Sequence, residues 1–153
     1  MADYDVTAKS AEALWAVAAS ERLSGLDEIV AARGRLWPRL HAILQRLGMD
    51  FVSPSIAVER GSGPIEFTAA LLVPDGVSYD VGGASTTELP GLGRVAATVI
   101  RGECFDAGFA ALHAWIAKSG EEETGELREI YLDCDGPRET WVVERQLALA
   151  TQD

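Results

Sequence analysis

The sequence is poor in the residues that bind metals or cross-link small proteins. It has two cysteines and two histidines in 153 residues, and Cys104 and Cys134 stand in no Cys-x-x-Cys spacing and in no His/Cys cluster. Zinc sites need three or four such ligands, so we expect neither a metal nor a cofactor. The two cysteines predict free thiols in a reducing cytoplasm, and a disulfide between them stays open.

Positive charge is also scarce. The chain carries 13 Lys and Arg against 24 Asp and Glu, a net charge of −11, so we expect no direct binding of nucleic acid. No apolar run approaches the roughly 20 residues of a membrane helix, and residues 1–10 lack the pattern of a signal peptide. With 48% hydrophobic residues, the chain is expected to form one cytoplasmic domain over residues 1–153.

The common catalytic motifs are missing as well. The sequence contains no Gly-x-Ser-x-Gly nucleophile elbow, no His-Glu-x-x-His metal motif and no phosphate-binding loop. An enzymatic role would therefore depend on individual carboxylates and a tyrosine acting as base and donor.

What the sequence does contain is an internal repeat. Leu40-His41-Ala42 and Leu112-His113-Ala114 precede Gly48 and Gly120 at the same distance, and apolar residues recur with helical spacing before both glycines. Glycine is typical of the position that ends a helix. The constant register predicts a duplicated helix, with His41 and His113 as duplicated helix-surface residues. Cys104 is expected to be a small buried residue at the start of the second helix.

Strand-like segments complete each copy, at residues 14–18, 55–59, 65–73, 95–100, 127–132 and 141–149, although residues 10–20 would also suit a helix. They predict an α+β domain of two βαββ units with pseudo-twofold symmetry, repeat 1 at about residues 10–75 and repeat 2 at about 85–149. We expect an antiparallel sheet with two helices on one face and a ligand cleft on the other. Pro38 predicts that the first helix starts near it or kinks there, and residues 121–126 predict an exposed loop.

Strand alternation predicts which side chains share a face. Ile130 would lie under the helices, and Glu129 and Tyr131 would face the cleft together with Glu59 and Glu144. An aromatic wall with carboxylates suits a flat or cationic organic molecule, although a solvated sheet surface would show the same alternation. The candidate ligand-binding residues are Glu129, Tyr131, Glu144, Trp37, Phe67, Tyr79, Trp115 and Trp141.

The second repeat resembles a known family. The resemblance lies in Arg101-Gly102 before the helix, Leu112 with Trp115, the stretch "REIYL" at 128–132, and Trp141 leading to Glu144. In this order and spacing they are similar to the GyrI-like (gyrase-inhibitor-like) small-molecule-binding domain, the effector-binding domain of AraC-type and MerR-type multidrug-responsive regulators. The resemblance covers roughly residues 10–149.

The resemblance implies a duplicated βαββ fold and a central cleft for aromatic, often cationic, compounds. It matches Glu129 to the glutamate that meets the ligand's positive charge, and Glu144 to the glutamate of the last strand. Two departures leave the ligand's identity open: Glu59 stands where the family often has an aromatic residue, and Val143 where it often has threonine.

The residue pattern and the family resemblance together suggest three alternative functions. The first is a stand-alone binding protein for aromatic and cationic compounds, acting with or without a protein partner or as a homodimer. The second is a hydrolase that opens the cyclopropane ring of DNA-alkylating natural products, with Glu129 or Glu144 as general base and Tyr131 as a donor. The third is an inhibitor of a gyrase-type protein.

Overall fold

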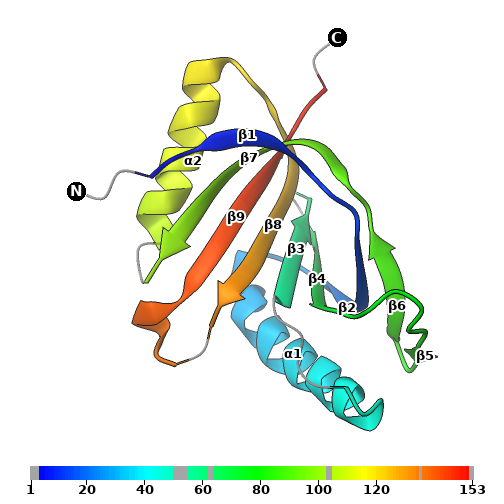
Figure 1. Ribbon diagram of the computed structural model, residues 1–153. Helices are drawn as coiled ribbons and strands as arrows, with labels where there is room; N and C mark the ends of the chain where they lie inside the picture. The colour runs from blue at the N-terminus through cyan, green and yellow to red at the C-terminus, as the bar shows by residue number, and fades with distance from the viewer. Residues whose placement is uncertain (1–3, 50–54, 62–63, 103–104, 135, 152–153) are drawn as a thin grey trace.

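The fold is a single curved sheet that carries two long helices (Figure 1). A computed structural model describes residues 4–49, 55–61, 64–102, 105–134 and 136–151. The helices are α1 (Ile29–Arg46) and α2 (Phe105–Ser119), with short 3-10 turns η1 (Leu26–Glu28) and η2 (Arg138–Thr140). The strands are β1 (Thr7–Ala11), β2 (Leu14–Leu23), β3 (Ser55–Arg60), β4 (Ile65–Leu72), β5 (Asp80–Val81), β6 (Ala84–Leu89), β7 (Leu92–Arg101), β8 (Glu123–Asp133) and β9 (Val142–Leu149).

The strand order makes the duplication visible. The antiparallel sheet runs β1-β7-β9-β8-β3-β4-β2-β6-β5, so that β7-β9-β8 of the second repeat mirrors β2-β4-β3 of the first. The two repeats meet where β3 pairs with β8, with Ile56 opposite Ile130. The predicted α+β fold of duplicated βαββ units is therefore confirmed.

Three strands have no counterpart in the sequence-based prediction. β1 and β6 add to the outer edges of the two repeats, on β7 and β2, and β5 extends β6. β1 and β6 are rich in small and polar residues, so neither carries the apolar alternation that indicates a strand. The predicted loop at residues 121–126 is also corrected, because β8 begins at Glu123 inside it.

The two helices end as the repeat predicts. α1 stops before Gly48 and α2 before Gly120, and both glycines adopt the left-handed conformation, with φ of 69° and 75°. Of the two alternatives predicted at Pro38, a helix start near it is wrong, because α1 begins at Ile29 and continues through Pro38; a kink there stays a prediction. An apolar stripe that packs on the sheet lies on both sides of the proline and outweighs its missing hydrogen bond: Ile29, Ala32, Leu36, Leu40, Ile43 and Leu44.

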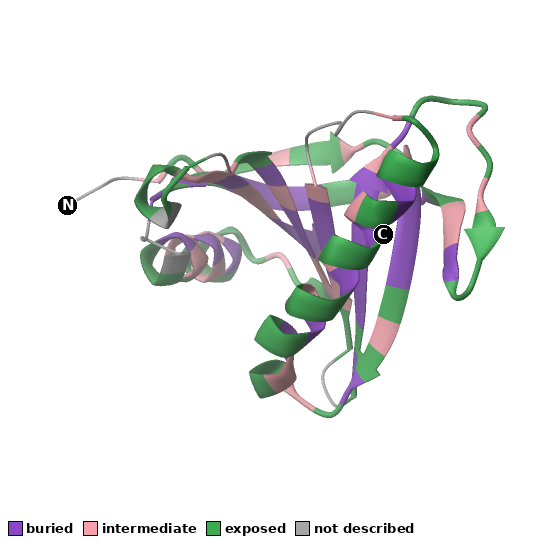
Figure 2. Ribbon diagram, turned by 90° about the horizontal axis from the view of Figure 1, so that it is seen from below, coloured by how far each residue is buried: buried purple, intermediate pink, exposed green. Residues whose placement is uncertain are grey.

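Both helices pack on the same face of the sheet. α1 covers β2 and β4, where its buried stripe meets Phe67 and Ala69, and α2 covers β7 and β9, where Leu112 meets Ala96 and Leu147. In Figure 2 the strands behind the helix in front, α1, are coloured as buried. The opposite face has a smaller apolar cluster, formed by Ala16, Ala18, Ile56, Val58, Ala70 and Leu89.

Helix α2 lies unusually close to β7, and this contact is testable. A Cβ added at Gly108 would lie 2.5 Å from the side chain of the fully buried Ile100, whereas a Cβ at Gly34 on α1 would meet nothing within 4 Å. We expect Gly108→Ala to lower the free energy of unfolding by about 1 kcal/mol or more through overpacking. Gly34→Ala should raise it by about 0.5–1 kcal/mol through helix propensity. Urea unfolding of both variants measures the difference, and equal effects would contradict the close packing of α2.

Candidate functional site

A pocket of about 290 Å³ opens beside α1 on the helix-bearing face. Its wall comes from α1, the start of β3, β8 and the residues after β8, and it is mainly apolar and aromatic. The lining residues are Val30, Arg33, Trp37, His41, Ser55, Tyr131, Cys134 and Trp141. A concave, largely apolar pocket with few polar groups is the usual form of a small-molecule site.

Three aromatic rings stand edge to face in the pocket wall. The ring centroids of Trp37 and Tyr131 lie 5.7 Å apart at an interplanar angle of 81°, and those of Tyr131 and Trp141 lie 6.3 Å apart at 88°. The ring of Phe67, which is fully buried on β4, meets the Trp37 ring edge to face, with the ring centroids 6.1 Å apart. Edge-to-face pairs hold one another in place, so these rings form a preorganised wall.

Helix α1 supplies its half of the pocket through one stripe. Val30, Arg33, Trp37 and His41 are spaced by three or four residues, so they lie on one side of the helix. The sequence-based prediction included Trp37 but not the other three. The same helical spacing that revealed the apolar stripe could have revealed this neighbouring one, with Arg33 as its charged member.

The face assigned to Glu129 and Tyr131 needs correction. The two side chains do share a face with Ala57 and Glu59, as the alternation predicts, since β3 and β8 pair Ala57 with Glu129. That face, however, carries the helices: Tyr131 packs in the core cluster of α1, and Glu129 bonds to Arg33 of α1. Ile130 points to the opposite face, where it packs against the smaller apolar cluster. Alternation gives relative facing only, and both faces of this sheet are apolar.

Glu129 is a buried carboxylate bound by two guanidinium groups. Its side chain is 2% exposed; Arg33 Nη2 donates to Oε1 at 2.6 Å, and Arg145 donates to Oε2 through Nη2 at 2.8 Å and Nε at 3.1 Å. The Tyr131 hydroxyl lies 3.4 Å from Oε1, and the Arg145 guanidinium stands 4.4 Å from the Phe109 ring of α2. This cluster, called here the Glu129 ion cluster, connects α1, the sheet and α2.

Burial and the charge of Glu129 raise the pKa values of two neighbouring groups, Glu59 and Tyr131. Burial raises the pKa of the Glu59 carboxyl, and the nearby Glu129 charge raises it further against the opposing effect of Arg33 and Arg145. Burial, followed by the Glu129 charge, raises the pKa of the Tyr131 hydroxyl, which therefore stays protonated at neutral pH. The like-charge pair of this site is thus Glu59 with Glu129.

Glu144 lies away from the Glu129 ion cluster. Its pairing with Ile130 places it on the face opposite the helices, where it accepts from Lys9 Nζ at 2.8 Å and from Gln146 Nε2 at 2.6 Å. The prediction that Glu129 and Glu144 face one cleft is therefore wrong. Trp141 and Val143 lie on the helix-bearing face instead, since both belong to or pack against the core cluster beneath α1.

The other predicted aromatic residues do not line this pocket. Tyr79 packs at the edge of the core cluster under α1, and its backbone bonds to Thr86. Trp115 packs on the apolar cluster of α2. Of the eight candidate ligand-binding residues, the structure brings Trp37, Tyr131 and Trp141 together around the pocket, with Phe67 and Glu129 in contact with them.

The two histidines have different surroundings. His41 lines the pocket, whereas His113 on α2 packs on Phe109 with ring centroids 4.4 Å apart and places Nδ1 3.2 Å from Glu123. Over the described residues, no group of three or more His, Cys, Asp or Glu is arranged to hold a metal. Cys104 lies outside the described residues, so the prediction for it stays a prediction.

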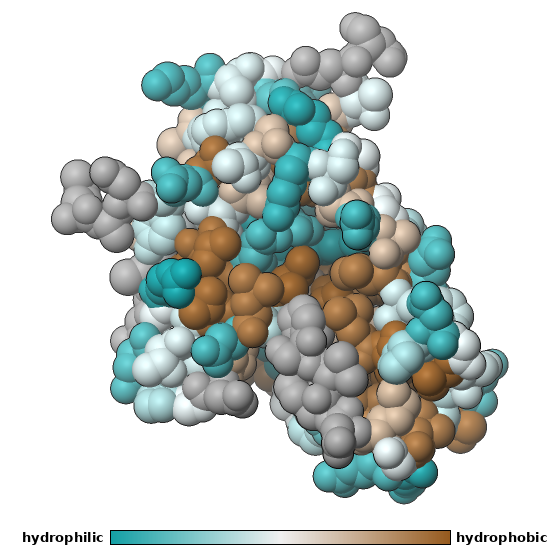
Figure 3. All heavy atoms as spheres, viewed as in Figure 1, coloured by the Kyte–Doolittle hydropathy of each residue, from teal (hydrophilic) through white to brown (hydrophobic). Residues whose placement is uncertain are grey.

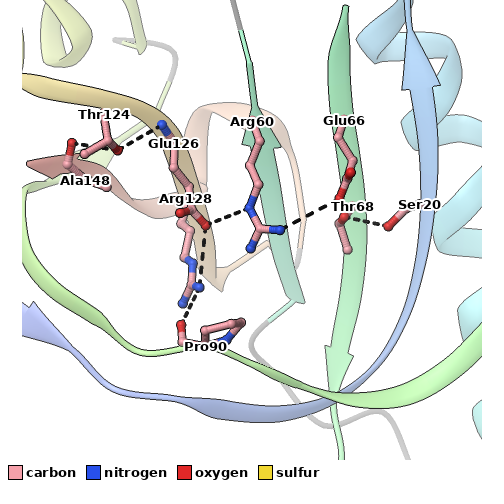
Figure 4. Close-up of polar contacts among 9 residues, drawn as sticks. All are labelled: Ser20, Arg60, Glu66, Thr68, Pro90, Thr124, Glu126, Arg128 and Ala148. Carbon is pink, nitrogen blue, oxygen red and sulfur yellow. Dashed lines mark hydrogen bonds and ion pairs between the residues drawn. The ribbon is translucent and has the colours of Figure 1, made fainter.

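A second hollow, of about 340 Å³, lies on the opposite face between β2, β3, β4 and β6. Beside it a row of polar side chains crosses the sheet (Figure 4): Glu126 accepts from Arg60 at 3.1 Å and lies 3.7 Å from Arg128, and Ser20 and Thr68 share a hydrogen bond of 2.6 Å. Arg128 is 1% exposed and donates to the Pro90 carbonyl. Among the residues that the structure describes, no aromatic ring lines this hollow, so the two faces of the sheet offer different chemistry.

The molecular surface carries polar and apolar regions side by side. On the face seen in Figure 3, hydrophilic side chains gather in the upper middle, and hydrophobic side chains lie below and beside them. Within the described residues, neither helix has the length and apolar character needed to cross a membrane.

Solved structures share the fold of this chain, whereas sequence comparisons find no match. No family model matches the sequence, and no curated protein is detectably similar to it. Among solved structures, the C-terminal domain of EcmrR aligns over 97% of this chain and 99% of its own, with a TM-score of 0.74 and 12% identity. The chain has the GyrI-like fold.

Two further structures share the GyrI-like fold. SAV2435 bound to tetraphenylphosphonium aligns over 97% of this chain and 94% of its own, with a TM-score of 0.69 and 13% identity. A hydrolase from Listeria innocua aligns over 95% and 91%, with a TM-score of 0.66 and 15% identity. At these identities the likeness establishes the GyrI-like fold and leaves the ligand to be argued from this chain's own residues.

Proposed function

We propose that this chain is a small-molecule-binding protein whose ligand site is the pocket beside α1. The ligand is a flat, hydrophobic, aromatic compound held between Trp37 and Trp141 with the Tyr131 ring as floor. The observation that carries the proposal is the set of three edge-to-face rings around a pocket of about 290 Å³. Support for an aromatic ligand, though not for its flatness, also comes from a protein of the same fold that has been solved with tetraphenylphosphonium, a cation with four phenyl rings.

The ring geometry gives the proposal its physical basis. An aromatic ligand gains from buried area and from favourable contacts with the edges and faces of neighbouring rings. Because the three rings already support one another, little side-chain order has to be created on binding. The predicted preference for cations requires Glu129 to be available to the ligand. Both oxygens of Glu129 already accept hydrogen bonds from arginines, so the ring geometry supports an aromatic ligand but not a cationic one.

Exchange of one tryptophan for leucine tests the site. We expect Trp37→Leu to weaken binding of a planar aromatic dye by at least about tenfold, because it removes one wall of the pocket. Trp115→Leu is the matched control: Trp115 is the same residue type on the other helix, packed away from the pocket, and its loss should change the affinity less than about twofold.

The measurement is a dye titration followed by fluorescence polarisation, with thermal melting of each variant to show that it folds. Equal losses of affinity in Trp37→Leu and Trp115→Leu, or no loss in either, would overturn the assignment of the pocket.

The hydrolase function has less support from the geometry. A general base needs an available lone pair, but Glu129 is bound by two guanidinium groups, and Glu144 bonds to Lys9 on the other face. Tyr131 keeps its proton, but its raised pKa makes it a weak acid, and its hydroxyl donates to Glu129 Oε1 at 3.4 Å. Incubation with cyclopropane-bearing compounds tests this function, and turnover beyond one equivalent would favour it over binding alone. The role of a gyrase-type inhibitor stays a prediction, to be tested by recovery of gyrase with the ligand-free protein.

A further inference from the structure

Among the described residues, the charged side chain that lines the aromatic pocket is basic, although the chain as a whole is acidic. Over the described residues, no carboxylate lines the pocket, and the permanently charged group in its wall is the guanidinium of Arg33. His41 is the other basic side chain in the lining. A ligand in this pocket therefore meets positive charge first, although the chain carries a net charge of −11. Charges at distant surface positions are screened by salt over about 8–10 Å.

Glu129 does not reverse this sign. Its charge is matched by Arg33 and Arg145 together, and its side chain is 2% exposed. The remaining carboxyl of the group, Glu59, does not line the pocket, and its pKa is raised by burial and then by the Glu129 charge. A ligand cation could reach Glu129 only by displacing an arginine, and it would then lie beside that displaced positive charge.

Arg33 retains donors for a ligand. A guanidinium has five N–H donors, and the bond to Glu129 uses one of them, at Nη2. Arg33 Nε and Trp37 Nε1 are buried and have no hydrogen-bond partner among the described residues. Buried donors without acceptors are costly, and a ligand that brings acceptor oxygens to this wall would relieve that cost after small side-chain adjustments.

We propose that the pocket selects planar aromatic anions, with the ring against Trp37 and Trp141 and the ligand's carboxylate paired with Arg33. This inference rests on the proposed function and specifies its ligand class. Arginine is suited to the role because its planar fork can hold Glu129 on one side and a second oxyanion on another.

Three naphthalene compounds of nearly equal size test the proposal on the unmodified protein. They are 2-naphthoate, 2-naphthamide and 2-naphthylmethylammonium, which differ mainly in charge, and isothermal titration calorimetry at 0.15 M salt gives their affinities. We expect the carboxylate to bind at least about tenfold tighter than the ammonium compound, with the amide between them, as a charge-assisted hydrogen bond implies.

Substitutions then assign the preference to Arg33. In Arg33→Gln the advantage of the carboxylate over the amide should fall to less than about twofold, and Arg33→Lys should retain part of it. Arg35→Gln is the matched control, because Arg35 lies on the same helix, pairs with Glu21 and does not line the pocket. It should keep the advantage seen in the unmodified protein.

The outcomes separate the two levels of the proposal. A higher affinity for the ammonium compound, or a carboxylate advantage that Arg33→Gln and Arg33→Lys both leave unchanged, would overturn the anion preference while leaving an aromatic-binding protein. Absence of binding by all three compounds would overturn the proposed function itself. If Arg33→Gln does not fold, the ligand series on the unmodified protein and Arg33→Lys still decide.

Discussion

Replacement of Glu129 by glutamine is expected to lower the free energy of unfolding by about 3 kcal/mol, the largest effect of any single change described for this domain. Glutamine keeps the shape of the side chain but removes the charge that holds Arg33 and Arg145, whose nitrogens approach its oxygens at 2.6 and 2.8 Å. Two guanidinium groups would then face each other across a buried neutral amide. The loss is large because Glu129 is 2% exposed and water cannot replace it.

Thermal and urea unfolding measure this change, with Glu21→Gln as the control. Glu21 pairs with Arg35 at 2.6 Å through side chains that are 28% and 55% exposed, and solvent screening makes the contribution of such a pair small. A melting temperature for Glu129→Gln within a degree or two of the unmodified protein would show that the Glu129 ion cluster does not hold the helices to the sheet.

Replacement of Arg128 by methionine is expected to act in the opposite direction and to raise the free energy of unfolding by about 2 kcal/mol. Arg128 is 1% exposed on the other face, its Nε has no partner among the described residues, and its nearest carboxylate, Glu126, lies at 3.7 Å. Burial lowers the pKa of the Arg128 guanidinium, with Glu126 opposing that effect. The lowered pKa means that the fold disfavours this charge.

The cost of the substitution is one hydrogen bond to the carbonyl of Pro90. Pro90 is exposed, so water can take the place of the lost donor, and methionine fills the space of the aliphatic stem. Urea unfolding provides the measurement. Destabilisation by more than about 1 kcal/mol would mean that the bond to Pro90 outweighs the burial of an incompletely paired charge.

Together the two variants distinguish a complete ion cluster from an incomplete one. Glu129 has donors on both oxygens, and its removal leaves two charges without their partner; Arg128 has few partners, and its removal takes away a cost. If burial alone determined the effect, removing either buried charge would change the free energy of unfolding in the same direction. Changes of opposite sign would therefore point to the difference in pairing.

Much of the fold could be predicted from the sequence because it depends on local periodicity and on the repeat. The helical spacing before Gly48 and Gly120 and the apolar strand segments are local features, and the matching register of the two copies gave the βαββ duplication. β1 and β6 escaped prediction because their pairing depends on the backbone of an existing strand rather than on an apolar pattern.

The site could be predicted only in part. Strand alternation correctly grouped Glu129 with Tyr131, but which group faces the helices depends on tertiary packing, since both faces of this sheet are apolar. Arg33 and Arg145 determine the charge of the site, and they come from a helix and a strand that are distant in the sequence. Arg145 was detectable as a charged residue between Val143 and Leu147 on the covered face.

A crystal structure of the protein with 2-naphthoate would show whether the aromatic pocket holds an anion. We expect the naphthalene ring in contact with Trp37 and Trp141, and the carboxylate within hydrogen-bond distance of Arg33, with the bonds between Glu129 and Arg145 intact. A ligand bound instead on the opposite face, in the hollow lined by Ser20 and Thr68, with the aromatic pocket empty, would contradict this binding mode.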